Sequence, residues 1–184
     1  MLSVSVGDAK NEWPIWVVQK RDFARFGLDP SDSATSPPRS LLISGRGDDR
    51  AANTLHLHDG EGTIPMPFWR EAAYVFAKSD GFWDRVPFAD RWERLLAVSP
   101  DSALDMDHLV ARYELSEIEV LMKRIDTRSY KEHPIMIRAK SGGATMIATT
   151  LRPFGGLGIQ PSGLAHNPAG SELIWCLLQE LEPR

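Results

Sequence analysis

The sequence predicts an α+β fold in which a small antiparallel sheet packs with about five helices. Two observations support this fold class. Apolar residues alternate as in strands near both ends of the chain, and in the middle they recur with helical spacing. The chain has 184 residues, a length that suits one domain, so we expect a single globular domain over residues 1–184.

Charge and cysteine content limit the class of protein. The chain carries 21 Lys and Arg residues against 25 Asp and Glu residues, a formal charge of −4, which gives no general attraction to nucleic acid or to anionic lipid. The single Cys176 cannot form an internal disulfide and favours a reducing compartment. We find neither a signal peptide nor an apolar run of the ~20 residues that span a membrane. We therefore expect a cytoplasmic protein without membrane contact.

The first part of the chain mixes strands with one helix. Residues 2–6 alternate in the manner of a strand, and the segment from Pro14 to Phe26 has the spacing of an amphipathic helix. Residues 29–40 are rich in Ser, Pro and Asp, which predicts a mobile surface loop. Leu41-Leu42-Ile43 is a short apolar run typical of a buried strand.

Two segments have the pattern of β-hairpins. In residues 53–66, an alternating stretch is followed by the turn residues Asp59-Gly60-Glu61-Gly62 and by a returning strand. In residues 135–151, Gly142 and Gly143 separate two strand-like stretches. We expect these two hairpins to form the sheet.

Four helices are expected in the middle and one near the end. Ser116, with Glu119 three residues later, has the pattern of a capping box. The expected helices begin at Pro67, Pro87, Asp101 or Ser102, Ser116 and Ser171.

An excess of aromatic residues in the middle suggests a binding surface. Trp69, Phe82 and Trp83 do not fit the apolar faces of the expected helices, and exposed aromatic residues often anchor protein–protein contacts. The competing interpretation is that these side chains fold back as a second core. We expect a non-enzymatic protein-binding module, such as an inhibitor, immunity protein or accessory subunit from a mobile element or phage. Its partner would be another protein, or a second copy in a homodimer.

A pair of histidines gives the first alternative. On a strand, His56 and His58 would point to the same side, with Asp59 and Glu61 at the adjoining turn. Two imidazoles and a carboxylate can hold a divalent metal with an open position for an activated water. The chain would then be a metal-dependent enzyme with a divalent metal as cofactor. Solvated histidines on a half-exposed strand explain the same pattern.

The second alternative is a DNA-binding regulator built on residues 104–126, which resemble a helix-turn-helix motif. The expected recognition helix begins with Glu117 and Glu119, which repel phosphate, so we expect no nucleic-acid partner. The sequence contains no GxSxG, HExxH or CxxC motif. Cys176 lies in the apolar stretch of the last helix, where we expect it to fill the core instead of reacting as a thiolate.

Overall fold

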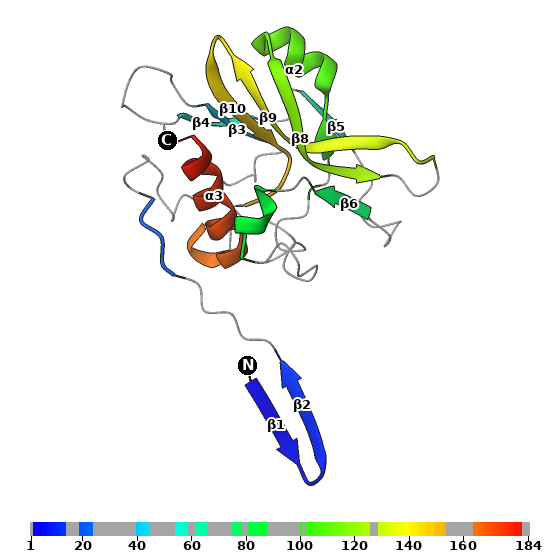
Figure 1. The fold of residues 1–184 in the computed structure, drawn as a ribbon, viewed down its shortest axis with the longest axis vertical. Coiled ribbons are helices and arrows are strands. Elements are labelled where there is room, and N and C mark those ends of the chain that lie inside the picture. The colour runs from blue at the N-terminus through cyan, green and yellow to red at the C-terminus, as the bar shows by residue number, and fades with distance from the viewer. Residues whose placement is uncertain are drawn as a thin grey trace.

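The structure is a computed structural model that describes residues 2–13, 19–23, 40–44, 54–58, 62–65, 75–78, 81–87, 100, 102–125, 129–153 and 164–181. The described strands form a six-stranded antiparallel sheet in the order β4-β3-β10-β9-β8-β6 and two further pairs, β1-β2 and β5-β7 (Figure 1). The strands are β1 (Leu2–Val6), β2 (Ala9–Trp13), β3 (Ser40–Ser44), β4 (Thr54–His58), β5 (Thr63–Pro65), β6 (Val75–Lys78), β7 (Ser102–Leu104), β8 (Ser116–Ile125), β9 (Glu132–Ser141) and β10 (Ala144–Thr149).

Two α-helices lie in the described part of the chain, α2 (Met106–Tyr113) and α3 (Pro168–Glu180), with the short 3-10 helices η2 (Trp83–Arg85) and η4 (Leu164–His166). The Asp105 side chain accepts a hydrogen bond from the His108 amide at 3.2 Å and caps α2. Asn167 caps α3 in the same way through the Gly170 amide at 3.1 Å. Each cap satisfies an amide at the helix start that has no carbonyl partner within the helix.

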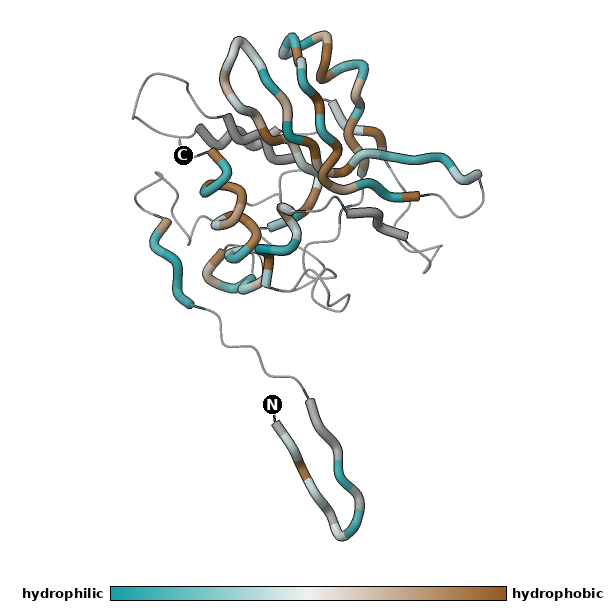
Figure 2. The backbone as a smooth tube through the Cα atoms, viewed as in Figure 1, coloured by the Kyte–Doolittle hydropathy of each residue, from teal (hydrophilic) through white to brown (hydrophobic). Residues whose placement is uncertain are grey.

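The central strands are buried on both faces. On one face, Leu121, Met136 and Ile147 form a core cluster with apolar residues of α3. On the other face, Ile137, Ala139 and Met146 pack with Leu109 of α2 and Leu104 of β7. Figure 2 shows apolar residues concentrated in α3 and in the strands next to it. This double burial explains why β9 contains an almost continuous apolar run.

The segment 19–23 is tied to α3 by an ion pair. Arg21 donates from Nε and Nη2 to the two carboxylate oxygens of Glu172, at 2.9 and 2.8 Å. The guanidinium also lies 5.0 Å from the ring centre of Trp175, and Phe23 meets the same ring edge-on at 6.1 Å. The hydrogen bonds that Arg21 donates to Glu172 raise the pKa of the guanidinium. Glu172 is only 2% exposed, and Arg21 supplies the positive charge and the hydrogen bonds that its buried carboxylate needs.

The expected fold class is wrong in its balance of helices and strands. Antiparallel strands dominate the described residues, which do not contain the about five helices that we expected. The segment from Ser116 is strand β8, and Val75–Lys78, expected within the helix from Pro67, is strand β6. These two strands pair with each other, and β8 also pairs with β9. The β-branched residues of β8 favour a strand, and pairing with distant strands overrides the local capping pattern.

One of the two hairpins is confirmed. Strands β9 and β10 are joined by Gly142 and Gly143, which both have positive φ, and they pair from Ser141 and Ala144 outward. The hairpin over 53–66 is wrong, because β4 pairs with β3 while β5 pairs with β7. The alternating pattern therefore predicted the strands there without identifying their partners.

The remaining expectations have mixed outcomes. The strands at 2–6 and 41–43 are confirmed as β1 and β3. A helix ending at Tyr113 and a helix near 171 are present as α2 and α3, but their expected starts are wrong, because Ser102–Leu104 is strand β7, α2 begins at Met106 after the cap Asp105, and α3 begins at Pro168. In the helix expected from Pro14, residues 19–23 have neither helical nor strand structure. Most of the helix expected after Pro87 and almost all of the loop 29–40 lie outside the described residues, while Ser40 already belongs to β3.

Candidate functional site

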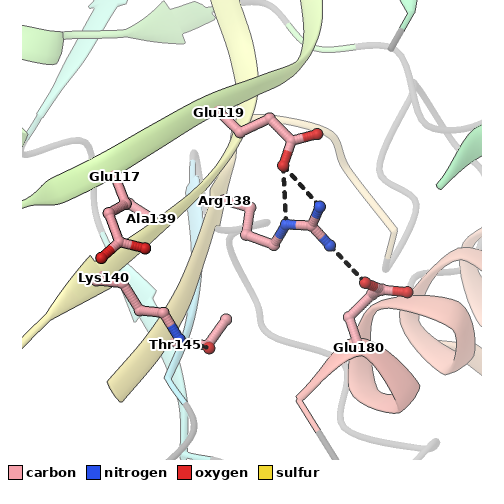
Figure 3. Close-up of a pocket in the computed structure, with 7 residues that line it drawn as sticks. All are labelled: Glu117, Glu119, Arg138, Ala139, Lys140, Thr145 and Glu180. Atoms are coloured by element: carbon pink, nitrogen blue, oxygen red, sulfur yellow. Dashed lines mark hydrogen bonds and ion pairs between the residues drawn. The ribbon is translucent and has the colours of Figure 1, made fainter. Parts of the chain in front are cut away.

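Arg138 on β9 joins the sheet to the C-terminal end of α3. Its Nε and Nη2 atoms donate to Glu119 Oε2 at 3.1 and 2.6 Å, and Nη1 donates to Glu180 Oε2 at 2.6 Å (Figure 3). The other oxygen of Glu180 pairs with Arg85 of η2. The Glu180 side chain is 3% exposed, so the two guanidinium groups compensate for the loss of its hydration.

A cavity of about 430 Å³ lies beside this network. Its walls come from β8, β9, β10 and α3, and its lining residues are Glu117, Glu119, Arg138, Ala139, Lys140, Thr145 and Glu180 (Figure 3). Lys140 donates from Nζ to Thr145 Oγ1 at 2.9 Å. The lining residues include no histidine, cysteine or serine. Their charged groups suit binding.

The cavity opens next to a stretch of β8 that has a partner on one edge only. Strand β8 pairs with β9 over most of its length, but β6 pairs only with Met122–Ile125 on the other edge. The Trp83 indole donates to the Leu121 carbonyl at 2.7 Å, directly beyond the last β6 pair. For residues 116–120 the described part of the chain provides no strand on this edge. We call residues 116–120 the open edge.

The open edge exposes apolar side chains. Ile118 and Val120 are 40% and 38% exposed, and they are among the few large apolar residues in the described ranges with that much contact with water. Unpaired amide and carbonyl groups on a strand edge can pair with another chain, and exposed apolar residues strengthen such pairing. This combination makes the open edge a candidate docking surface.

Glu117 occupies a β-bulge within the open edge. Ser116 pairs with Lys140 and Glu119 pairs with Arg138, so β8 contains one more residue than β9 between these pairs. Glu117 has a φ of 49°, in the left-handed region that costs a side-chain-bearing residue about 1–2 kcal/mol. The bulge brings Glu117 and Glu119 to the same cavity.

The expectation that Phe82 and Trp83 are exposed is wrong. Their exposed fractions are 3% and 4%, and both belong to the core cluster that contains α3. The two rings meet edge-on at 5.1 Å, and the Trp83 indole is hydrogen-bonded to β8. The competing interpretation, a second core, therefore describes them correctly. Trp69, the third residue of the expected surface, lies outside the described residues.

The metal hypothesis stays a prediction. His56 and His58 lie on β4, opposite Leu42 and Ser40 of β3, at an end of the strand order. Asp59 and Glu61 lie outside the described residues. Within the described ranges, no group of three or more His, Cys, Asp or Glu side chains could hold a metal ion.

The helix-turn-helix expected in residues 104–126 is wrong. Helix α2 occupies the first position, but the segment expected as recognition helix is strand β8. Glu114 ends α2 in the left-handed conformation, and Leu115 leads directly into the strand. The chain thus has no second helix at this position to enter a DNA groove.

Sequence reasoning missed the Arg138 network. Its residues are far apart in the chain, and only the folded sheet brings them together. One signal was available, because Arg138 is a lone charge between the apolar residues Ile137 and Ala139 of a buried strand. A charge in such a position is expected to have a partner.

Searches of family models, of curated proteins and of solved structures found no match to this chain. None of the helices in the described ranges has the length and apolar character required to cross a membrane.

Proposed function

We propose that this chain is a non-enzymatic protein-binding module that contacts its partner through the open edge of β8. The observation that carries the proposal is the exposure of Ile118 and Val120 on a strand stretch whose second edge has no described partner. Adding a strand to such an edge is a common way to bind a protein segment, because it satisfies backbone groups and covers apolar side chains together.

The surface differs from the one expected from the sequence. Phe82 and Trp83 support the open edge from within, since Trp83 fixes the Leu121 carbonyl where the edge begins. The cavity beside the edge adds charged groups that can select among partners. An inhibitor, an immunity protein or an accessory subunit of a mobile element or phage would use such a surface. We place it in the cytoplasm, where the thiol of Cys176 would remain reduced.

The test is affinity capture with three forms of the tagged protein. The wild type is compared with an Ile118→Asn/Val120→Asn variant and with a control, Val4→Asn/Tyr130→Asn, whose residues are 47% and 80% exposed and lie outside β8 and α2. We expect one partner to be recovered with the wild type and the control and to be lost with the open-edge variant. The melting temperatures should stay close, since exposed sites contribute little to stability. Equal recovery with all three forms would contradict the proposal.

The metal-dependent enzyme is separated by a thermal-shift series. Zn, Mn, Ni and Mg are added to the wild type and to a His56→Ala/His58→Ala variant. A metal present at ~100 times its Kd would stabilise the wild type by about 2.7 kcal/mol. We expect flat curves for both forms. A shift in the wild type that the variant lacks would favour the metal site over the binding module.

A further inference from the structure

We propose that the open edge binds an extended partner segment in which apolar residues alternate with lysine or arginine. The segment would add a strand to the sheet beside residues 116–120 and would place its basic side chains in the cavity. This inference rests on the proposed function and specifies the chemistry of the partner.

The charges along the edge favour a basic segment. Glu114, Glu117 and Glu119 all lie between Tyr113 and Lys123, and the chain has no lysine or arginine in this stretch. The described residues provide no hydrogen bond or ion pair to the Glu117 carboxylate. Glu119 uses only Oε2 for Arg138, which leaves Oε1 as an acceptor, and its side chain is 44% exposed.

The cations of the cavity are already engaged or lie farther from the edge. Arg138 is shared between Glu119 and Glu180, and Arg85 pairs with the other oxygen of Glu180, so these two cations and two carboxylates balance one another. Lys140 lies on β9, one strand away from the open edge, and its ammonium group bonds to Thr145 (Figure 3). Glu117 and the Oε1 atom of Glu119 are therefore the acceptors that the open edge offers to a basic side chain. A volume of about 430 Å³ exceeds that of a single lysine or arginine side chain.

The apolar residues of the proposed segment would contact the other face of the open edge. Side chains alternate between the two faces of a strand, so Ile118 and Val120 lie on the face away from Glu119. Val120 pairs with Ile137, which belongs to the core cluster under α2. Apolar residues of an added strand would extend this cluster across Ile118 and Val120.

A second copy of this chain fits the edge less well than a basic segment. Antiparallel pairing of two open edges would bring Glu117 and Glu119 of one copy close to the same residues of the other. Like charges on opposite strands are destabilising. The bulge at Glu117 further disturbs a regular ladder between two identical edges.

Synthetic peptides provide the test. A fluorescent probe that alternates Lys and Val is compared with one that alternates Glu and Val and with one that alternates Lys and Ser. The Lys–Val probe matches both faces of the edge, whereas the Glu–Val probe lacks the ion pairs and the Lys–Ser probe lacks the apolar contacts. We therefore expect the Lys–Val probe to bind roughly tenfold more tightly than either control probe. Binding should weaken as salt rises, because the carboxylates are exposed.

Two protein variants separate the charge contribution from general effects. Glu117→Gln should weaken binding of the Lys–Val probe about threefold. Asp107→Asn removes the same charge from an exposed position near the other end of α2 and should leave binding unchanged.

Amide hydrogen exchange tests where the probe binds. The amides of residues 116–120 that face the added strand should exchange more slowly once the probe is bound.

The outcomes distinguish this inference from the proposed function. If the Glu–Val probe bound as tightly as the Lys–Val probe, or if amide exchange at residues 116–120 did not slow on binding, the proposal of a basic partner segment would be wrong. If affinity capture still depends on Ile118 and Val120 in that case, the binding module stands with a different partner chemistry. If the capture does not depend on these residues either, both proposals fail.

Discussion

The indole nitrogen of Trp83 donates a hydrogen bond to the carbonyl of Leu121 at 2.7 Å, and this contact lies directly next to Met122, where the pairing of β8 with β6 ends. From Met122 onward, β6 pairs with β8, whereas for residues 116–120 no strand of the described ranges pairs with this edge. Trp83 thus satisfies one backbone carbonyl in the core at the boundary between these two parts of β8.

We predict that Trp83 contributes to stability. Trp83→Ala should lower the free energy of unfolding by about 3–5 kcal/mol, because the side chain is 4% exposed and its removal leaves a cavity. Trp83→Phe keeps an aromatic ring but leaves the Leu121 carbonyl without its donor, so we expect a loss of about 1–3 kcal/mol. Urea unfolding measures both values, and an unchanged midpoint in Trp83→Ala would contradict the buried position.

A second prediction concerns Gly170 in the first turn of α3. A Cβ atom built on Gly170 would overlap the carbonyl oxygen of Pro153, which also accepts a hydrogen bond from Asn167 Nδ2 at 3.0 Å. Gly170→Ala should therefore destabilise the fold by about 1–3 kcal/mol, even though alanine is the better helix former. Ser171→Ala, one residue along the helix, is the control and should change stability by less than about 0.5 kcal/mol. Thermal unfolding of both variants provides the comparison, and a stabilised Gly170→Ala would show that the backbone can move apart.

The third prediction compares two ion pairs that differ in burial. Arg138→Met removes both bonds to Glu119 and the bond to the nearly buried Glu180, so we expect a loss of about 2–4 kcal/mol. Lys123→Met removes the ion pair with Glu132, at 2.7 Å on an exposed surface, and should cost less than about 1 kcal/mol. Chemical denaturation gives both losses. Similar losses would mean that Arg85 alone satisfies Glu180.

The fourth prediction concerns the thiol of Cys176. Burial in α3, reinforced by the charge of Glu172, raises its pKa from 9.0 to about 11, against the opposite influence of Arg21 and Arg85. At pH 8 the thiolate fraction is then about a hundredfold lower than in the unfolded chain. Alkylation by iodoacetamide should be slower in the native protein by about that factor, with the reaction in urea as the control. Equal rates would show an exposed thiol.

The same pKa shift has a consequence for stability at high pH. Well below pH 8 the thiol is protonated in both states, so it adds no pH dependence. As the pH rises from 9 towards 11, the unfolded chain releases the proton first, and the free energy of unfolding falls. Cys176→Ala should remove this part of the alkaline loss, which a comparison of unfolding at pH 8 and pH 10 would measure.

The sequence predicted those elements whose signals are local. The β9–β10 hairpin was found because Gly142 and Gly143 connect two strands that pair with each other. Strand β8 was not found, because its spacing of Ile118, Met122 and Ile125 also fits a helix face. Ser116 and Glu119 strengthened the helical interpretation, and only pairing with β9 and β6 decides for the strand.

The candidate site was out of reach for a related reason. The carboxylates on Arg138 come from Glu119 and Glu180, which a local pattern cannot bring together. The burial of Phe82 and Trp83 likewise depends on α3 and β8, which are distant in the chain. Sequence reasoning could identify these aromatic residues as unusual, but it could not decide between a surface and a second core.

The order of the six-stranded sheet also affects how the chain folds. Strands β8, β9 and β10 follow one another closely, so they can form early from local contacts, whereas Leu41 of β3 must find Thr149 of β10 across most of the chain. During synthesis β3 and β4 can pair with each other, but they emerge long before β10, the strand that joins them to the rest of the sheet. Until β3 pairs with β10, the edge of β10 is as unprotected as the open edge of β8. An unpaired strand edge favours aggregation, so a newly made chain is exposed to it in the time between the formation of β10 and its pairing with β3.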